Sequence, residues 1–532
     1  MTGPSPAAAG GNLRTRAWPS VAAQVLAWCA RTPEAVAVVQ GERRWTYREL
    51  EQAVAGIAAQ LEASGLRPGQ VVAVTAHRGF ALVAAWVAVL LRRGVLLPVD
   101  PAVAPATREV MLTTSGARLD LRAGDVDALA HPGVPVVRAC GEPNAGTAGW
   151  GELPYPEPDE AGYVFFTSGS TGSPKAILGR HRSLSAFLAW LRSALQVTPD
   201  DRIPHLAGVG FDVTLREVFL PLTSGARLCL PPAGLMPPGE VLPWLGQAGA
   251  TVMHAVPTVA RAWLRAAPEG LCLPRLRGVL FSGEPLTDTL ITRWRHQLRY
   301  QGPIVNQYGP TETTLIRCWH PVVDPVPGVQ PLGRPIPGSE AWIEQPPGCR
   351  AATGTVGEIV IRTVYGTSGY LGADAESTAR FTFGPEGEVT YRTGDLGSVD
   401  EGGRLHFHGR RDDQIKIHGV RFHLHGVEAV LEAQPGIDQA AVTTEPGSDG
   451  GPPRLTAHLV LAPGHRQVPA GLRLALVDRL PAAAVPSRLI AVDELPRTSA
   501  SGKLDRHRLA APCPSDLPHG TVPAASHTKD TT

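Results

Sequence analysis

A short segment rich in hydroxyl residues and glycine follows an apolar run in the first half of the chain. It extends from Tyr163 to Lys175 and reads Y-V-F-F-T-S-G-S-T-G-S-P-K. Its first residues are aromatic or β-branched, which favours a buried strand. Glycines let a backbone turn tightly and bring its N–H groups near an anion, and hydroxyls and a lysine add donors for phosphate oxygens. The spacing is not G-x-x-x-x-G-K-[ST], so it predicts a phosphate-binding loop other than a P-loop. A Ser/Gly-rich surface turn is the plainer alternative.

This loop resembles the phosphate-binding signature of the adenylate-forming superfamily. That superfamily comprises acyl-CoA synthetases, luciferases and the adenylation domains of nonribosomal peptide synthetases. Its signatures usually end in Lys-Gly, whereas Ala176 follows the lysine in this chain. The resemblance implies a catalytic Lys175 that contacts the leaving phosphates. It also implies that the loop binds ATP through Thr167, Ser168, Gly169, Ser170, Thr171 and Gly172.

A second motif, N-Q-Y-G-P-T-E from Asn306 to Glu312, matches the superfamily pattern N-x-Y-G-P-T-E. Gly-Pro forces a tight turn that presents an aromatic ring on one side and a hydroxyl and a carboxylate on the other. The resemblance places Tyr308 against adenine, a catalytic Thr311 at the α-phosphate, and a catalytic Glu312 on Mg²⁺, for which one carboxylate is sufficient. The further ATP-binding residues that it implies are Gly283, Glu284, Asn306 and Gly309.

A third motif, Y-R-T-G-D-L from Tyr391 to Leu396, resembles the ribose-binding motif of the superfamily. It implies that Asp395 accepts hydrogen bonds from both ribose hydroxyls. Arg410 resembles the arginine that also contacts nucleotide hydroxyls. Relatives often have a tyrosine near this strand end, but this chain has Phe407, which lacks the hydroxyl. Asp412 resembles the hinge about which the small C-terminal domain of these enzymes rotates.

The C-terminal part of the chain contains one further motif and one departure from the pattern. S-G-K-L-D-R (501–506) resembles N-G-K-x-D-R and implies a catalytic Lys503, which would bridge the substrate carboxylate and the α-phosphate. Where relatives have R-x-R-I-E-L-G-E-I-E, this chain has His423, His425 and Gly426 in place of an acid, a glycine and an acid. That segment faces the active site of relatives during thiol transfer, so the departure concerns the second half-reaction more than the first.

The motif F-D-V-T, with Asp212 at its second position, points to the class of substrate. Amino-acid-activating domains use this aspartate to hold an α-ammonium group, and acyl-CoA synthetases generally lack it. The remaining substrate-binding positions implied by the motif spacing are Val213, Arg216, His254, Leu280, Ser282, Gln307, Leu315 and Ile316. Because a buried guanidinium needs a partner, Arg216 would face an acidic side chain of the substrate or an acid of the protein. These residues predict a polar α-amino acid, serine-like or acidic.

The resemblance implies attack of the amino-acid carboxylate on the α-phosphorus of MgATP, giving aminoacyl-AMP and pyrophosphate. The phosphopantetheine thiol of a separate carrier protein then takes the aminoacyl group, as in nonribosomal peptide biosynthesis. One alternative is an acyl- or aryl-CoA ligase, in which substituting Asp212 would not abolish activity. A second alternative is a nucleotide-binding relative without catalysis, and a third is transfer of the aminoacyl group to an amine.

Composition limits the other classes of function. The chain has 532 residues and a formal net charge of +1, which argues against nucleic-acid and anionic-membrane partners. Its 7 cysteines are scattered without a C-x-x-C pair, and no signal peptide is apparent, so we expect a reduced, cytoplasmic protein. The apolar run from Phe80 to Leu91 is too short to span a bilayer and predicts a buried helix.

The elements that must position these motifs follow from alternating apolar patterns. Helical spacing alternates with short β runs at Val36–Val39, Val71–Thr75, Val95–Val99 and Val134–Val137. The fold class expected is α/β, with a large N-terminal domain of doubly wound sheets, a small β-rich subdomain and a mobile α+β C-terminal domain. The expected boundaries are a disordered N-terminus (1–16), an adenylation core (17–411), a rotating domain (412–510) and a disordered tail (511–532). With no carrier-like segment after these, a free-standing enzyme is expected.

Overall fold

The computed structural model places two compact units along the chain, Met1–Gln414 and Ile415–Thr532. The residues that it describes are 19–103, 105–126, 131, 133–143, 156–157, 159–167, 175–234, 236–372, 378–411, 414–417, 420–445, 454–477, 479–480, 484–498 and 504–510. The two expected disordered ends, 1–16 and 511–532, lie outside these residues. Within them, no helix is both long and apolar enough to cross a bilayer.

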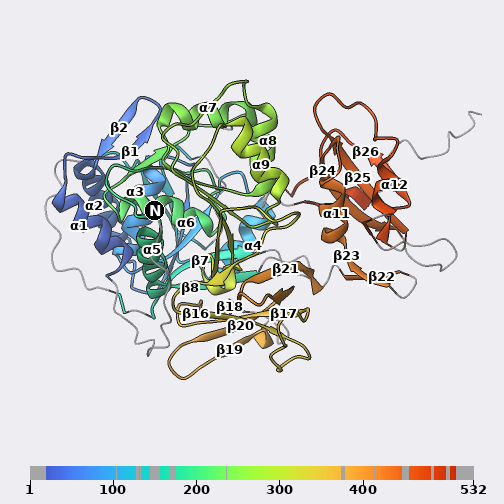
Figure 1. Cartoon of the computed structure of the whole chain (residues 1–532). Helices are drawn as coiled ribbons and strands as arrows, with labels where there is room; N and C mark the ends of the chain where they lie inside the picture. Colours follow the sequence, from blue (N-terminus) through green and yellow to red (C-terminus); the bar gives the residue numbers. More distant parts are fainter. Residues whose placement is uncertain are drawn as a thin grey trace, which may run out of the picture. The chain divides into compact units, whose positions relative to one another are not determined.

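The first unit contains two sheets with a parallel centre, as the alternating pattern predicts, and Figure 1 shows helices packed around them. A seven-stranded sheet has the order β18-β8-β7-β4-β3-β5-β6. Its strands are Tyr370–Leu371, Lys175–Arg180, Ala161–Thr167, Val95–Val99, Val71–Thr75, Leu119–Ala123 and Val136–Ala139. A five-stranded sheet has the order β11-β12-β13-β14-β15. Its strands are Val252–Ala255, Gly278–Ser282, Ile304–Tyr308, Cys318–Val322 and Arg334–Pro335.

A third sheet of the first unit is small and mixed. Its order is β2-β1-β10-β9, with strands Arg43–Thr46, Val36–Gln40, Arg227–Leu230 and Arg202–Pro204. The helices of this unit are α1 (Val21–Arg31), α2 (Tyr47–Ala63), α3 (Phe80–Leu91), α4 (Pro105–Ser115), α5 (His181–Leu195), α6 (Val213–Leu222), α7 (Pro238–Ala248), α8 (Pro257–Ala266) and α9 (Asp288–Gln297). Helix α3 is apolar on all sides and almost wholly buried, as a core helix must be.

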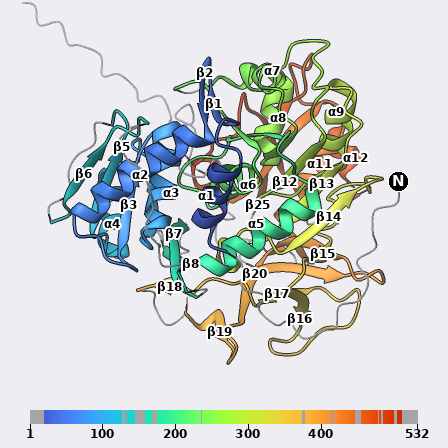
Figure 2. The same ribbon diagram turned by 90° about the vertical axis from the view of Figure 1, so that its left-hand side faces the viewer.

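The predicted β-rich subdomain is an antiparallel sheet, β16-β17-β20-β19, with β21 beside β20. Its strands are β16 (Ser339–Glu344), β17 (Gly357–Thr363), β19 (Phe381–Phe383), β20 (Val389–Val399) and β21 (Leu405–Arg410). Figures 1 and 2 both show this sheet below the β7–β8 pair.

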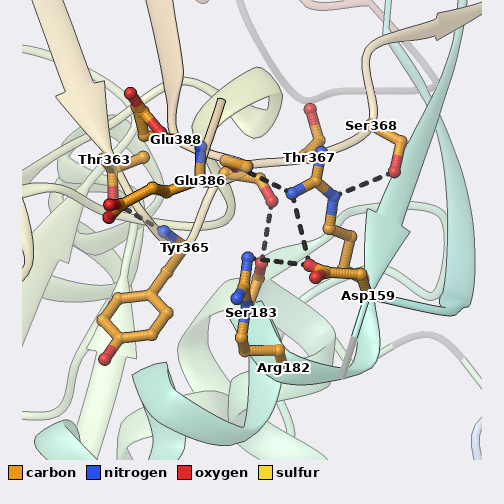
Figure 3. Close-up of polar contacts among 12 residues, drawn as sticks. Asp159, Arg182, Ser183, Thr363, Tyr365, Thr367, Ser368, Glu386 and Glu388 are labelled. Atoms are coloured by element: carbon orange, nitrogen blue, oxygen red, sulfur yellow. Dashed lines mark hydrogen bonds and ion pairs between the residues drawn. The ribbon is translucent and has the colours of Figure 1, made fainter. Parts of the chain in front are cut away.

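A polar cluster joins the β-rich subdomain to the seven-stranded sheet. The Arg180 guanidinium, on β8, donates to Ser368 Oγ over 3.0 Å and to the Gly387 carbonyl over 2.9 Å. Arg182 Nη2 lies 2.7 Å from Asp159 Oδ1. Figure 3 shows Asp159, Arg182 and Ser368 of this cluster.

The second unit is a smaller α+β body. Its central sheet has the order β24-β25-β26, with strands Ile437–Glu445, Arg454–Leu461 and Arg488–Ala491. Helices α11 (Leu424–Glu432) and α12 (Leu472–Val477) share its core, and α13 (Arg506–Ala510) packs beside β24. A two-stranded ribbon, β22 (Gln414–Ile417) and β23 (Val420–His423), precedes α11. The expected α/β fold class is confirmed.

Candidate functional site

The side chains of β11, β12 and β13 alternate between two hydrophobic cores. Met253, Val279 and Ile304 face one core, whereas Val252, Leu280 and Val305 face the core that contains helix α6. Because strand residues two positions apart share a face, His254, Ser282 and Gln307 point to the side of α6. All three lie at the carboxyl ends of parallel strands, the usual place for ligands in open α/β sheets.

We call the polar and apolar residues gathered there the α6 cluster. Its members are the predicted substrate-binding residues Asp212, Val213, Arg216, His254, Leu280, Ser282, Gln307, Leu315 and Ile316. They come from α6, from the three parallel strands and from the segment after the short 3₁₀ helix η1 (Thr311–Thr313). The sequence separation between its first and last members is large, so only the fold brings them together.

Asp212 directly precedes α6, where a carboxylate is favoured by the helix dipole. Its side chain is hydrogen-bonded to that of Thr311. Burial raises the pKa of Asp212, and the nearby Glu312 charge adds to this, while the Thr311 hydrogen bond and the Arg216 charge oppose it. A cationic group beside Asp212 would therefore relieve an unfavourable burial of negative charge. Thr311 contacts the expected ammonium anchor, and its role at the α-phosphate stays a prediction.

A hydrogen-bonded chain runs from α6 to β12. Glu217 Oε2 accepts from the backbone N–H groups of Leu206 and Ala207, both over 2.7 Å. Its Oε1 lies 3.4 Å from His254 Nδ1, and His254 Nε2 lies 2.7 Å from Ser282 Oγ. Burial would raise the pKa of Glu217, but the His254 hydrogen bond and neighbouring positive charges lower it. The carboxylate is thus ionised opposite His254.

His254 is neutral in this arrangement, because burial lowers its pKa to about 4, with a further contribution from the Arg216 charge. A neutral imidazole opposite an ionised carboxylate carries its proton on Nδ1. Nε2 then accepts the Ser282 hydroxyl hydrogen. Ser282 consequently presents oxygen lone pairs, rather than a donor, to its remaining surroundings.

Arg216 and Gln307 form the second polar pair of the α6 cluster. Arg216 Nη1 donates to Gln307 Oε1 over 2.6 Å, and both side chains are 2% exposed. Burial lowers the pKa of Arg216 to about 10, against the charges of Glu217 and Asp212. We expected this guanidinium to pair with an acid of the substrate or of the protein. Among the described residues its hydrogen-bond partner is a neutral amide.

The turn after β13 is held in a strained conformation beside this pair. Thr314 and Leu315 have φ values of 70° and 60°, which are unusual for residues with a side chain. A Cβ atom on Gly309 would lie 2.5 Å from Ile316 Cα and 2.7 Å from Arg317 N. The glycine of the motif is therefore required by the close passage of residues 315–317.

The predicted nucleotide-binding residues meet at the β-rich subdomain. Tyr308 Oη donates to Asp395 Oδ2 over 2.5 Å, and Arg410 Nη1 lies 2.6 Å from Asp395 Oδ1. Asp395 and Arg410 are directly paired on β20 and β21. Burial, and then the Asp395 charge, raises the pKa of Tyr308 well above its usual value, so its phenol remains a donor. Asp395 is thus fixed from two sides, by Tyr308 and by Arg410.

Glu312 and Lys175 lie on either side of a tyrosine. Tyr370 Oη donates to Glu312 Oε1 over 2.6 Å, and Lys175 Nζ lies 5.9 Å from the centre of the Tyr370 ring. Glu312 is 8% exposed, and its backbone carbonyl accepts from the Thr367 hydroxyl over 2.6 Å. A buried carboxylate is a suitable ligand for a hard cation that also contacts phosphates. No group of three His, Cys, Asp or Glu side chains among the described residues could enclose a metal ion by itself.

The other predicted ATP-binding residues have contacts within the protein. The Asn306 side-chain amide donates to the Pro331 carbonyl over 2.8 Å. Glu284 Oε2 accepts from the Thr258 N–H over 3.1 Å, in the first turn of α8. Gly283 is exposed and has a φ of 90°. Any contact of these three with a nucleotide stays a prediction.

Several predicted site residues lie outside the residues that the structure describes. Thr167 and Lys175, which bracket the phosphate-binding loop, are described and are cross-strand partners on β7 and β8. The predicted site residues outside the described ones are Ser168, Gly169, Ser170, Thr171, Gly172, the hinge Asp412 and the catalytic Lys503. Their roles stay predictions.

Comparison with known proteins agrees with this arrangement. The family model of the AMP-binding enzymes matches residues 25–371, and that of the AMP-binding enzyme C-terminal domain matches residues 426–503. The chain belongs to the AMP-binding enzyme family. Members of this family are adenylate-forming ligases that use ATP with Mg²⁺, so the predicted superfamily and cofactors are confirmed.

Two relatives of this AMP-binding enzyme are a tripeptide synthetase and a lipopeptide synthase. The phosphinothricin tripeptide synthetase PhsC of Streptomyces viridochromogenes is 36% identical over 91% of this chain. The isonitrile lipopeptide synthase of Mycobacterium tuberculosis is 32% identical over 93% of it. The chain spans 44% and 19% of the lengths of these two proteins.

Solved structures show the same fold. A four-domain nonribosomal peptide synthetase, holo-AB3403 bound to AMP and glycine, is similar with a TM-score of 0.79 and 26% identity, over 97% of this chain and 38% of that one. The O-succinylbenzoate coenzyme A synthetase MenE of Bacillus subtilis, in complex with AMP, is similar with a TM-score of 0.77 and 24% identity, over 93% and 98% of the two chains.

Two residues that position the site were not among the predicted ones. Glu217 orients His254, and its signal in the sequence is a lone acid directly before the apolar run V-F-L-P-L of α6. Tyr370 holds Glu312, but no motif contains it. A pattern in the sequence could have suggested the first residue and not the second.

Proposed function

We propose that this AMP-binding enzyme activates the carboxylate of a polar α-amino acid as aminoacyl-AMP. The observation that carries the proposal is Asp212, a partly buried carboxylate whose pKa is raised and which lies at the head of the α6 cluster. A plain carboxylic acid offers no cation to that carboxylate, whereas the α-ammonium group of an amino acid does. The amino-acid side chain would then lie along α6, toward Arg216, His254, Ser282 and Gln307.

The proposed reaction balances without a proton transfer. A carboxylate oxygen of the amino acid forms a bond to the α-phosphorus, the bond between that phosphorus and the bridging oxygen breaks, and pyrophosphate leaves. The nucleophile is already ionised near neutral pH, so no general base is needed. Positioning and charge neutralisation remain as the sources of catalysis.

The roles of the protein's groups follow from this reaction. Asp212 holds the ammonium group, Asp395 with Tyr308 and Arg410 holds the ribose and adenine, and Lys175 neutralises the leaving phosphates. Lys503 is proposed at the carboxylate and the α-phosphate. Glu312 would hold Mg²⁺, which supplies positive charge to the phosphate oxygens.

The second half-reaction would transfer the aminoacyl group to a carrier protein. A phosphopantetheine thiol would lose its proton, its sulfur would attack the aminoacyl carbonyl, and AMP would leave as the thioester forms. The two synthetase relatives support this choice of acceptor over coenzyme A or an amine.

Pyrophosphate exchange into ATP tests the first half-reaction directly. Purified protein is assayed with proteinogenic amino acids and, in parallel, with simple aliphatic and aromatic carboxylates. We expect exchange with at least one polar amino acid, loss of exchange by at least a hundredfold in Asp212→Ala, and little change in Asp288→Ala. Asp288 is a matched control because it is another aspartate at the N-terminal end of a helix, α9, and does not belong to the α6 cluster.

Exchange with carboxylates alone, unaffected by Asp212→Ala, would establish an acyl- or aryl-CoA ligase instead. No exchange with either class, in protein shown to bind ATP, would favour a non-catalytic nucleotide-binding relative.

A further inference from the structure

One edge of the Arg216 guanidinium group makes no hydrogen bond with the described residues. Its Nη1 donates to Gln307, but Nε and Nη2 have no hydrogen-bond partner among the described residues, and neither has Gln307 Nε2. All three are buried nitrogen atoms that can only donate. A buried donor without an acceptor is costly, and a buried charged donor especially so.

A second buried arginine of the same unit has the corresponding edge paired. Arg317 is 1% exposed, and its Nε and Nη2 donate to the carbonyls of Thr313 and Tyr365, each over 2.5 Å. The same edge that is filled by two backbone oxygens in Arg317 is open in Arg216. Arg317 therefore serves as a paired reference for Arg216 within the same unit.

The acids near Arg216 are engaged elsewhere. Glu217 Oε2 accepts two backbone N–H groups, and its Oε1 faces His254. Asp212 is hydrogen-bonded to Thr311. Both carboxylates act on Arg216 through their charge, but no ion pair of Arg216 with either is present among the described contacts. The open edge therefore has no acceptor supplied by these neighbours.

The shape of the open edge selects among possible ligands. Nε–H and Nη2–H lie side by side and parallel, which matches the two oxygens of a carboxylate in a bidentate pair. Gln307 Nε2 offers a third donor next to them. A serine hydroxyl or a carboxamide has one acceptor oxygen and would leave donors unpaired, whereas a carboxylate has acceptor sites for all three. Ser282 adds no competing donor, because its hydroxyl hydrogen is directed to His254.

We propose that Arg216 and Gln307 bind the anionic side chain of the substrate, which makes this AMP-binding enzyme selective for an acidic α-amino acid. The inference rests on the proposed function and narrows it from polar to acidic side chains. Asp212 and Arg216 are one helical turn apart on α6, so one face of this helix would hold the ammonium group and the side-chain anion of the same molecule.

Paired substrates that differ only in the side-chain acid test the proposal. Pyrophosphate exchange is measured with aspartate and asparagine, with glutamate and glutamine, with serine, and with 2-amino-4-phosphonobutyrate to separate a phosphonate from a carboxylate. We expect kcat/KM at least tenfold higher for one of the acids than for its amide or for serine. Arg216→Gln should abolish that preference, lowering kcat/KM for the acid by at least tenfold more than for the amide.

Two further variants separate recognition from folding. Arg216→Met should retain the wild-type melting temperature or raise it, because it removes an incompletely paired buried charge. Arg317→Gln should lower the melting temperature and leave the acid-to-amide ratio unchanged, because it removes a fully paired one. Higher activity with serine or an amide than with every acid would overturn the proposal, as would an equal loss for acid and amide in Arg216→Gln.

The failure of the proposed function would be distinguishable from the failure of this inference. If no amino acid supports exchange, calorimetric titration of wild-type protein and Arg216→Gln with glutamate and aspartate still decides the anion site. Binding to the wild type that weakens at least tenfold in the variant supports the site, and equal or absent binding in both rejects it.

Discussion

The phenol oxygen of Tyr308 lies 2.5 Å from Oδ2 of Asp395, although the two residues are 87 positions apart in the chain. One belongs to the five-stranded sheet and the other to the β-rich subdomain. Two sequence motifs that are each predicted to contact a nucleotide thus also contact each other. If they do bind ATP, part of the site is already formed without it.

Asp395→Asn should raise KM for ATP by about tenfold or more, since a hydrogen bond to a charged group is worth about 1.5–3 kcal/mol. Tyr308→Phe should have a smaller effect on KM, because the carboxylate keeps its contact with Arg410. Exchange kinetics at varied ATP concentration measure both. Equal KM values for Asp395→Asn and the wild type would show that this carboxylate does not hold the ribose.

Tyr370→Phe should raise the Mg²⁺ concentration needed for half-maximal exchange by about tenfold. The hydroxyl orients Glu312, and groups that orient a metal ligand typically affect metal affinity by about ten- to a hundredfold. Tyr300→Phe is the matched control, since that hydroxyl donates to the Pro303 carbonyl. A Mg²⁺ response of Tyr370→Phe that equals that of the control would separate Glu312 from the metal.

Acid should destabilise the wild type more than His254→Gln. In the folded protein the pKa of His254 is about 4, against about 6.5 when unfolded. The unfolded state therefore binds a proton that the folded state refuses as the pH falls from 6.5 toward 4, and stability is lost over that window. At pH 5 the loss is about 2 kcal/mol. The melting temperature of the wild type should therefore fall more between pH 7 and pH 5 than that of His254→Gln. An equal fall in both proteins would contradict a neutral buried His254.

Gly309→Ala should destabilise the first unit by about 2–3 kcal/mol, because the added methyl group would meet backbone atoms of residues 315–317 that cannot move aside cheaply. Gly56→Ala in α2 is the control. Its Cβ atom meets nothing within 4 Å, so it should stabilise the protein by about 0.5–1 kcal/mol. Chemical denaturation measures both, and a Gly309→Ala protein as stable as the control would show that the turn can open.

Much of the first unit could be predicted from local pattern. The runs Val71–Thr75 and Val95–Val99 are strands with the predicted bounds, and the apolar run Phe80–Leu91 is the buried helix α3. The run expected at Val134–Val137 is instead a strand at Val136–Ala139. Pro135 has no N–H to donate, so regular pairing begins after it.

The candidate site, too, could be predicted only in part from the sequence. Residues inside motifs, such as Asp212 and Asp395, could be proposed as site residues from the motif alone, and their roles stay predictions. The partner of Arg216 could not, because Gln307 comes from a strand distant in the sequence and only packing decides which buried groups meet. The contact of Tyr370 with Glu312 could not be predicted for the same reason.

The chain from Ser282 through His254 to Glu217 ends on the backbone of residues 206 and 207, just beyond β9 of a different sheet. Exchanging only the residues of the α6 cluster for those of another adenylating enzyme would leave Glu217 and its two backbone hydrogen bonds unchanged. Substitutions that aim to change the substrate of this enzyme should therefore include position 217 and residues 205–207 together with the α6 cluster.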